Sequence, residues 1–577
     1  MYKDDSQLDD FFGLKPENQD KISNLHKTPI KKPGLKETIL FIPQLLSKKE
    51  RYLTLFLFFV IIGSIISIPV SAYFHFTKSA PDYGGYFIEG LIGEPRYINP
   101  LLARTSDVDR DLASLIYSGL MKYNKEGKIV PDLMKSYEVS SDGLNYTVYL
   151  KENTRWHDGA NITADDVIFT IQTIQNSDYG SPERINWQGV DMEKIGDHAL
   201  IFKLKNKYAQ FLNNLTIRIL PKHLWQDVKP INFAFFELNL KPIGSGPYKF
   251  EKFKKDKNGR IISYELSANR NYYDSRPYID KVEFKFYNSE DELIDNYNKN
   301  EIDSIGSISS KNIKKLKFKQ RLSIHKLEIP RYFALFFNQN QSKTLSDKNI
   351  RLALNHGTNK EELIQKVLDG NGTIADAPLN ENIFDVGDDI KKYNYDTEKA
   401  KEYLKSTKEV KLKLSTSAWP ELTEIASLLK EQWARVGIEL DIEVMQTPEL
   451  QQIIKERNYE ILLFGEILSP DPDLFSLWHS SQKKDPGLNL ALYDNKNADT
   501  LLEEARQTLN PNDRIAKYQE FQKLLAEDVP AIFLYNPHYL YPQGKQIKGY
   551  ETQMIGMPSD RFANIEKWYI ETKRTWK

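Results

Sequence analysis

A histidine and three aspartates stand close together in the segment RWHDGANITADDVIFT, residues 155–170. His157 and Asp158 are neighbours, and Asp165 and Asp166 follow shortly after. An imidazole beside carboxylates is a combination that proteins use for proton transfer. The segment therefore raises the hypothesis of an active site.

The same residues also fit the beginning of a helix. Thr163 directly precedes an apolar run with helical spacing, and its hydroxyl is placed to accept the backbone N–H of Asp166. Asp165 and Asp166 then fall in the first turn, where the helix dipole favours negative charge, and Asp158-Gly159 is a turn pair. Because no partner constellation for catalysis stands elsewhere, we interpret the segment as strand, turn, N-cap and helix. The apolar run consists of Val167, Ile171 and Ile174.

The composition is that of a globular protein with several domains. The chain has 577 residues, of which 40% are hydrophobic, and this length exceeds that of a typical single domain. Its net charge of -1 implies no general attraction to nucleic acid or to anionic lipid. Cysteine is absent, which excludes disulfides, thiolate metal sites, a cysteine nucleophile and a lipid-modified N-terminal cysteine.

One segment, Tyr52 to Thr77, contains no Lys, Arg, Asp or Glu. It covers the roughly 20 apolar residues that a helix needs to cross a bilayer. Because Lys48, Lys49 and Arg51 precede it, the positive-inside rule predicts that residues 1–51 are cytoplasmic and that the remainder is outside. Residues 1–51 are polar with little periodicity, so we expect them to be mostly disordered. A cleaved signal peptide is the alternative, with Val70-Ser71-Ala72 as its cleavage site, although the sequence before that site is longer than an ordinary signal.

Strand and helix patterns alternate after the short linker of residues 78–85. The sequence EVSSDGLNYTVYLKENTRW alternates like a hairpin with Asp142-Gly143 at its turn, and KVEFKFY at 281–287 has the alternation of a strand. We expect helices over 290–298, 421–436, 499–507 and 513–527, the second of them ended by Gly437. A mixture of this kind over nearly 500 residues predicts α/β domains.

Eight blocks of sequence follow one another in a recognisable order. They are EPRYINPLLA (94–103), residues 115–170 beginning LIYSGLMKYN, PIGSGPYKF (242–250), residues 268–287 beginning ANRNYYDSRP, residues 345–372 beginning LSDKNIRLAL, YDTEKAKEYL (395–404), SPDPDLFSLWHSS (469–481) and residues 498–535 beginning ADTLLEEARQ. With these blocks the chain from about Tyr86 onward resembles the family 5 extracellular solute-binding proteins, which are peptide- and oligopeptide-binding receptors of ABC importers.

The resemblance implies an α/β, two-lobed periplasmic-binding-protein-like fold of type II with an extra domain, here preceded by one transmembrane helix at 52–77. Lobe I would combine residues 86–130, 244–326 and 531–577. The extra domain would be 131–243, and lobe II would be 327–530. Ligand would be enclosed between the lobes by a hinge motion, so no catalytic group and no cofactor is expected.

The resemblance also implies which segments contact the ligand. They are the loop 104–106, the hinge strand 331–333, the region 464–479 and the second hinge near 535–536. The residues expected to bind are Arg104, Thr105, Tyr332, Phe333, Glu466, Ser469, Trp478, Tyr535 and Asn536. For the aromatic members a place in the core is the alternative. Asp471, Asp473 and His479 are alternatives for holding a cation, although three scattered ligands are a weak pattern.

The chain departs from the family pattern in two places. Peptide-binding members usually carry an aspartate shortly before the Asp-Pro, where it pairs with the peptide's α-amino group, whereas this chain reads Glu466-Ile467-Leu468-Ser469-Pro470. Glu466 is the candidate substitute, and non-peptide solutes such as nickel complexes, haem and sugars stay open as ligands. The second departure is the apolar segment, which replaces a lipid anchor and adds a cytoplasmic tail.

The leading functional prediction is a receptor held at the cell membrane that delivers peptides or another small solute to ABC permease subunits. An anchored sensor or adhesion module with the same fold is the second hypothesis, and co-purification of a permease or of a signalling protein would separate the two. An enzyme is the third, and no nucleophile elbow, phosphate loop or His-Glu-x-x-His motif supports it. No nucleic-acid partner is expected.

Overall fold

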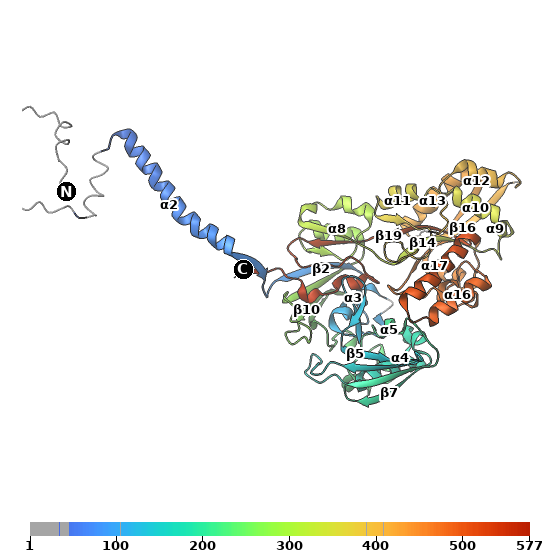
Figure 1. The fold of residues 1–577 in the computed structure, drawn as a ribbon, viewed down its shortest axis with the longest axis horizontal. Helices are drawn as coiled ribbons and strands as arrows, with labels where there is room; N and C mark the ends of the chain where they lie inside the picture. Colours follow the sequence, from blue (N-terminus) through green and yellow to red (C-terminus); the bar gives the residue numbers. More distant parts are fainter. Residues whose placement is uncertain (1–33, 35–45, 104–105, 388, 408) are drawn as a thin grey trace, which may run out of the picture. The chain divides into compact units, whose positions relative to one another are not determined.

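The computed structural model describes residues 34, 46–103, 106–387, 389–407 and 409–577. It forms two compact units, one made of residues 1–79 with 574–577 and the other of residues 80–573 (Figure 1).

The first unit contains the long apolar helix α2 (Lys48–Phe76), which begins four residues before the predicted span. Ser47 and Glu50 form a reciprocal capping box at its start. None of its residues is buried, and its length and hydropathy suffice to cross a membrane. Strand β1 (Thr77–Pro81) follows directly and pairs with β21 (Thr572–Trp576) at the end of the chain.

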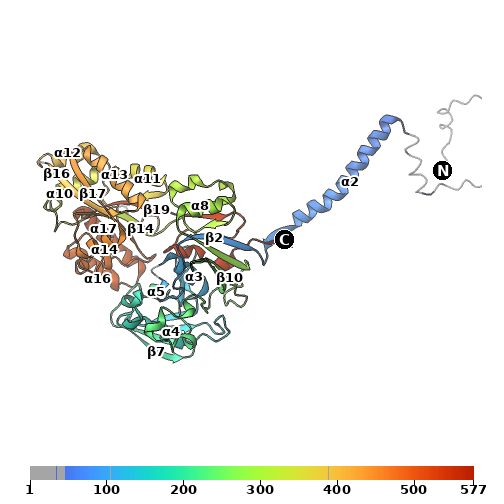
Figure 2. The ribbon, with the colours of Figure 1, turned by 180° about the vertical axis from the view of Figure 1, so that it is seen from behind.

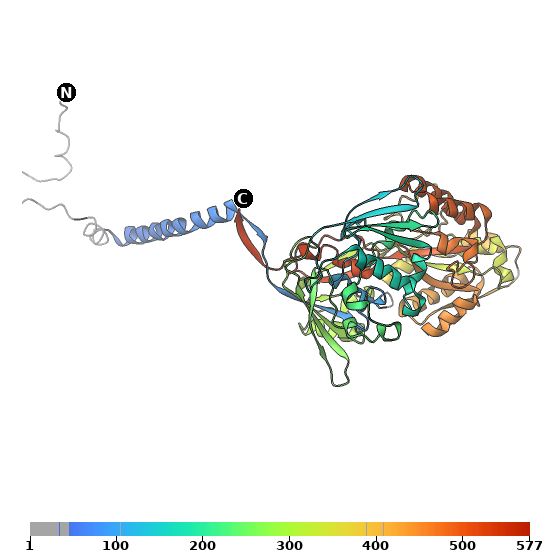
Figure 3. The same ribbon diagram turned by 90° about the horizontal axis from the view of Figure 1, so that it is seen from below.

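The second unit begins with a five-stranded sheet in the order β12-β2-β11-β10-β9. Its centre is the parallel pair β2 (Tyr86–Ile92) and β11 (Lys281–Tyr287), and the predicted strand KVEFKFY is β11. The antiparallel hairpin of β9 (Tyr248–Lys255) and β10 (Ile261–Ala268) projects from the sheet (Figure 3). The fifth strand, β12 (Ser304–Ile305), is parallel to β2.

A four-stranded antiparallel sheet, β5-β6-β8-β7, carries the predicted hairpin. The turn between β5 (Met134–Val139) and β6 (Asn145–Leu150) has Gly143 at a φ of 71°, a left-handed value that glycine adopts without strain. Helix α4 (Ala164–Gln175) covers this sheet and places Val167, Ile171 and Ile174 in the core. The same apolar core continues under the five-stranded sheet. The other two strands are β7 (Val190–Gly196) and β8 (Ala199–Leu204).

The largest sheet has six strands in the order β15-β19-β14-β18-β16-β17. Strand β14 (Arg331–Phe337) lies between β19 (Ala531–Pro537) and β18 (Ile461–Ile467), and its alternate residues enter two different apolar clusters. Both faces are therefore covered by helices, as Figure 2 shows with α10 and α13 on one side and α16 and α17 on the other. The remaining strands are β15 (Gly372–Ile374), β16 (Val410–Ser417) and β17 (Ile438–Met445).

The helices around this sheet follow the predicted periodicity. Helix α13 (Pro420–Ala434) is followed by Gly437 at a φ of 89° and then by β17. Helices α16 (Lys496–Gln507) and α17 (Pro511–Asp528) cover the predicted segments. Helix α8 (Glu290–Asn298), which packs on β2 and β11 of the five-stranded sheet, has the predicted bounds. The other helices are α3 (Asp107–Ile116), α5 (Phe211–Asn214), α6 (Lys222–Trp225), α7 (Pro230–Phe233), α9 (Lys343–Ser346), α10 (Lys348–His356), α11 (Lys360–Leu368), α12 (Thr397–Leu404), α14 (Thr447–Glu456) and α15 (Phe475–Trp478).

The chain passes twice between the five-stranded and the six-stranded sheet regions. One passage joins β13 (Leu322–Leu327) to β14, and the other joins β19 to β20 (Tyr539–Gly544). Strands β13 and β20 pair with each other, so the two passages lie side by side. Nε2 of His538 lies 3.2 Å from Oε1 of Glu328, so the two passages are also joined by a side-chain contact. The last strand pair is β3 (Met121–Tyr123) with β4 (Ile129–Pro131).

Candidate functional site

The histidine and aspartates of residues 155–170 are bound to the surrounding backbone. Gly244 donates its N–H to Nδ1 of His157 at 3.2 Å, and Nε2 lies 3.1 Å from the carbonyl oxygen of Gly246. Burial lowers the pKa of His157 to about 4, so the ring is neutral near pH 7. His157 therefore positions the segment PIGSGPYKF and has no free nitrogen for catalysis.

The helix start confirms the N-cap interpretation. Thr163 and Asp166 form a reciprocal capping box, in which each side chain accepts the other residue's backbone N–H. Asp166 accepts the N–H of Thr163 at 2.8 Å and that of Lys222 at 2.9 Å. The Thr163 hydroxyl also donates to the Asp166 carboxylate at 3.4 Å. Asp158 is engaged as well, at 2.8 Å from His223.

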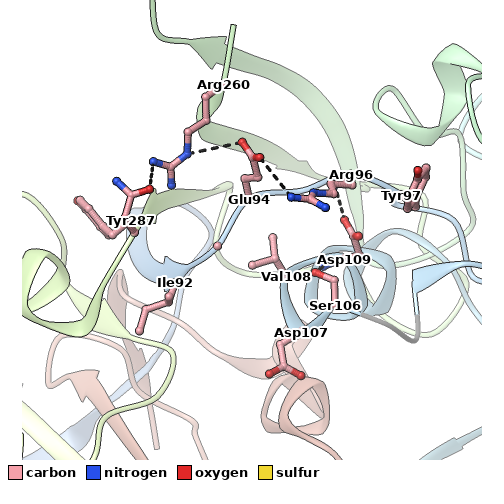
Figure 4. Close-up of a pocket in the computed structure, with 12 residues that line it drawn as sticks. Ile92, Glu94, Arg96, Tyr97, Ser106, Asp107, Val108, Asp109, Arg260 and Tyr287 are labelled. Carbon is pink, nitrogen blue, oxygen red and sulfur yellow. Dashed lines mark hydrogen bonds and ion pairs between the residues drawn. The ribbon is translucent and has the colours of Figure 1, made fainter. Parts of the chain in front are cut away.

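A cavity of about 470 Å³ opens at the carboxyl ends of β2 and β11, beside the start of α3 (Figure 4). Open α/β sheets commonly bind ligands outside the carboxyl ends of their parallel strands. Most of the lining is polar or charged, which suits a hydrated polar solute. It consists of Ile92, Gly93, Glu94, Arg96, Tyr97, Ser106, Asp107, Val108, Asp109, Arg260, Tyr287 and Asn288.

A row of charges crosses this cavity. Glu94 lies 3.5 Å from Arg260 and 3.9 Å from Arg96, as the dashed lines of Figure 4 show. Asp109 is buried and accepts the Arg96 N–H at 2.8 Å through Oδ1, while its Oδ2 has no hydrogen-bond partner among the described residues. Burial raises the pKa of Asp109 to about 6. Asp109 is therefore an acceptor with unused capacity in the wall of the cavity.

The predicted loop 104–106 borders this cavity. Ser106 is one of its lining residues and caps α3 by accepting the Asp109 N–H at 3.3 Å. Arg104 and Thr105 themselves lie outside the described residues. Their role in ligand binding stays a prediction.

Three predicted residues, Tyr332, Glu466 and Trp478, lie together in the interior. They are on the face of the six-stranded sheet that α16 and α17 cover. Tyr332 and Glu466 face each other across β14 and β18, and the Tyr332 hydroxyl donates to Oε2 of Glu466. Oε1 of Glu466 has no partner among the described residues, and burial raises the pKa of Glu466 to about 8. Trp478 is 1% exposed and packs against Phe336 and Phe533. Glu466 is thus a neutral acid in a closed apolar interior near pH 7.

The other four predicted residues are distributed over the hinge strands and one loop. Phe333 and Tyr535 stack with ring centroids 5.1 Å apart on the opposite face of the sheet. Asn536 is buried, and its Oδ1 has no partner among the described residues. The Ser469 hydroxyl donates to the carbonyl of Asp471 in its own loop. Nothing in the geometry brings these residues into the cavity of Figure 4.

The carboxylates considered for a cation are neutralised by arginines. Asp471 lies 2.9 Å from Arg514, and Asp473 lies 3.0 Å from Arg506. His479 contacts Glu503 at 3.2 Å. Within the described part of the chain no group of three or more His, Cys, Asp or Glu is arranged to hold a metal ion. The ion pairs of Asp471 and Asp473 therefore hold their loop in place.

Two further charged residues have no ion-pair or hydrogen-bond partner among the described side chains. Arg331 begins the hinge strand β14, and Glu421 stands in the first turn of α13. Both are partly buried. Burial lowers the pKa of Arg331 and raises that of Glu421. Arg331 belongs to the predicted hinge segment, whereas Glu421 has an ordinary position for an acid in a helix and was missed.

The sequence profile described as "Bacterial extracellular solute-binding proteins, family 5 Middle" matches residues 128–488, more than half of the chain. The chain belongs to this family. It is 31% identical to the oligopeptide-binding protein AppA of Bacillus subtilis over 524 residues, which cover 85% of this chain and 93% of AppA. It is 27% identical to the dipeptide-binding protein of Escherichia coli, with 82% and 93% covered.

Solved structures show the same fold. The ABC transporter substrate-binding protein CtaP from Listeria monocytogenes superimposes with a TM-score of 0.76 at 30% identity, covering 85% of this chain and all of that one. AppA from Bacillus subtilis in complex with a nonapeptide gives a TM-score of 0.69 at 29% identity, with the same coverage. The predicted family and its α/β periplasmic-binding-protein fold are therefore confirmed. The family consists of extracellular solute-binding proteins.

Proposed function

We propose that the protein is a membrane-anchored receptor that encloses short peptides between two lobes and delivers them to an ABC importer. Helix α2 would cross the membrane, with residues 1–51 in the cytoplasm and the binding region outside. The proposal adds the ligand, the partner and the topology to the family assignment. The names of the relatives support peptides as the ligand class, because AppA and the dipeptide-binding protein bind them.

The observation that carries the proposal is the boundary between two bodies within residues 80–573. The buried apolar clusters divide cleanly, because each draws its residues either from 87–329 and 540–568 or from 332–535. We call these the N-terminal body (86–329 and 539–573) and the central body (331–537). Among the described residues, no buried apolar cluster includes side chains from both bodies.

Several polar contacts cross this boundary. Lys311 pairs with Glu424, and Lys314 lies 2.9 Å from Asp369. On another side, backbone carbonyls of 471 and 472 accept from Asn213 and Gln210, each at 3.0 Å. Exposed ion pairs such as the first two exchange with water at small cost, whereas a shared apolar core would not. The two bodies are therefore able to separate about the paired passages at 328–330 and 538, as a receptor that closes around its ligand requires.

Arg331 and Glu421 supply charges for the ends of a peptide. A short peptide carries one ammonium and one carboxylate, and each is costly to bury without a partner. Arg331 lies within the electrostatic influence of Glu421, Tyr535 and Tyr539, and of Arg110 in the N-terminal body. Besides burial, the charges of Glu290 and Lys311 in that body affect the pKa of Glu421. These two unpaired groups at the boundary replace the missing amine-binding aspartate in our proposal, since Glu466 lies inside the central body.

The function is tested by native mass spectrometry on a fragment beginning at Ala80, purified without denaturant. We expect co-purified adducts whose masses correspond to short peptides. A peptide present at 100 times its Kd adds about 2.7 kcal/mol to stability, so a peptide pool should raise Tm. A single non-peptide adduct would change the ligand class. A protein without adducts whose Tm ignores every peptide pool would contradict transport and favour the sensor hypothesis.

Removing either end charge of the peptide, or its protein partner, is expected to weaken binding. Unpairing one partner of a desolvated charge pair costs about 2–5 kcal/mol, which corresponds to at least a 30-fold higher Kd. We expect this loss for Arg331→Gln with free peptides and for wild-type protein with C-terminally amidated peptides. We expect the same loss of affinity for Glu421→Gln with free peptides and for wild-type protein with N-acetylated peptides. Isothermal titration calorimetry measures both.

The matched control is Arg435→Gln, which removes an exposed arginine that lies 3.8 Å from Glu362. It should leave Kd unchanged. If wild-type protein binds free and end-blocked peptides equally, peptide binding stands and the roles of Arg331 and Glu421 are wrong.

A further inference from the structure

The last residues of the chain hold the end of helix α2. Arg574 donates to the Thr77 hydroxyl at 2.7 Å, to the Thr77 carbonyl at 2.8 Å and to the Phe74 carbonyl at 3.1 Å. Its guanidinium also lies over the Phe74 ring, 4.3 Å from the centroid. The Lys577 N–H donates to the Phe76 carbonyl at 2.9 Å. Carbonyls at the C-terminal end of a helix lack intrahelical donors, and here the C-terminal strand supplies them.

We call residues 574–577 and the end of α2 the clamp. The clamp exposes several aromatic side chains. Trp576 is 74% exposed, and Phe74 and Phe76 are 56% and 57% exposed. Tyr73 is also exposed and lies beneath Arg574. Large apolar surface left open on a folded element marks a surface that another phase or partner covers.

We propose that residues 574–577 and the last turn of α2 form one membrane-interface element, whose partner is the headgroup layer of the bilayer. The inference rests on α2 crossing the membrane as proposed above. Tryptophan and tyrosine favour this layer because one part of each ring is apolar and another part is hydrated. Lys78, Arg574 and Lys577 add positive charge, which anionic headgroups attract. The C-terminus of the chain is thereby fixed at the membrane surface, together with the end of the anchor.

Lipid is the expected partner because the exposed aromatic surface continues directly from the membrane-spanning part of α2. The exposed rings of Phe74 and Phe76 belong to the same helix as the span, and Trp576 lies on the strand that pairs with the residues directly after it. A bilayer that surrounds α2 ends close to Phe76, since roughly 20 residues fill the hydrocarbon core. Trp576 then falls at the depth where aromatic belts occur.

The absence of cysteine allows a direct measurement. In the full chain, Lys577→Cys carries the only thiol and takes an environment-sensitive fluorophore. The chain is placed in nanodiscs of phosphatidylcholine and phosphatidylglycerol with a nitroxide on the lipid headgroup. We expect several-fold stronger quenching at residue 577 than at a label on Lys430→Cys, which is exposed on α13. Equal quenching at the two positions would overturn the proposal.

Two further measurements separate the parts of the inference. Flotation with vesicles after an alkaline wash tests α2 itself, and a chain that does not float removes the basis of the proposal. Arg574→Gln in the Lys577→Cys chain should lower quenching at 577 at least twofold, because the strand loses three hydrogen bonds to the helix end. Unchanged quenching in this variant would show that Arg574 is not the clamp. Trp576→Ser should lower it as well.

Discussion

Arg561→Met is expected to lower the free energy of unfolding by about 3–5 kcal/mol, because two buried carboxylates then lose the cation that pairs with both of them. Arg561 is 1% exposed and lies 2.6 Å from Glu89 and 2.5 Å from Asp111. The Tyr541 hydroxyl donates to the same glutamate at 2.7 Å. The cluster joins β2, α3 and the C-terminal part of the chain, so its loss affects the whole N-terminal body.

Chemical denaturation at pH 7 measures this effect. Lys401→Met is the control, since its ion pair with Glu398 is exposed and contributes about 0–1 kcal/mol. Burial raises the pKa of Glu89 even with Arg561 present. Protonation of Glu89 should therefore rescue part of the Arg561→Met defect in acid. A loss of stability no larger than that of the control would show that the pair does not hold this body together.

Glu466→Gln should make the protein more stable at neutral and alkaline pH. It should also remove the pH dependence of stability that Glu466 causes. The pKa of Glu466 is raised to about 8 by burial, from the usual 4.5. Between these values the folded state keeps a proton that the unfolded state has lost. The contribution of Glu466 to the free energy of unfolding is therefore fully present below pH 4.5. Above that pH the free energy of unfolding falls by about 1.4 kcal/mol per pH unit until the folded pKa is passed.

The expected result is a wild-type protein that loses stability between pH 5 and 8 and a Glu466→Gln variant whose stability changes less over that range. Urea denaturation at several pH values provides the comparison. Glutamine keeps an acceptor for the Tyr332 hydroxyl and has no proton to lose. Glu456→Gln, on the exposed surface of α14, is the control and should follow wild type. Parallel pH profiles for Glu466→Gln and wild type would contradict a neutral buried acid.

The fold was largely predictable, because its signals are local and repeated. The turn at Asp142-Gly143, the helix start at Thr163 and the helix at 290–298 each depend on a few neighbouring residues. Eight ordered blocks then indicated the family.

The candidate site was harder to predict, because burial on both faces of a sheet erases the sequence signal. Strand β14 reads RYFALFF, a continuous apolar run, so the pattern does not say which face of the sheet Tyr332 occupies. Glu466 lies opposite it by register and therefore enters the same interior. The arginines that neutralise Asp471 and Asp473 come from α17 and α16, far along the chain. Whether Arg104 and Thr105 bind ligand stays a prediction.

The paired passages at 328–330 and 538 have a mechanical consequence. Two adjacent strands that cross a boundary together resist twisting and sliding, and they leave rotation about one axis as the soft motion. The relative position of the bodies then depends on a single angle. In the receptor that we propose, a ligand held between the bodies would fix that angle. The outer surfaces of both bodies would then differ between the empty and the filled receptor.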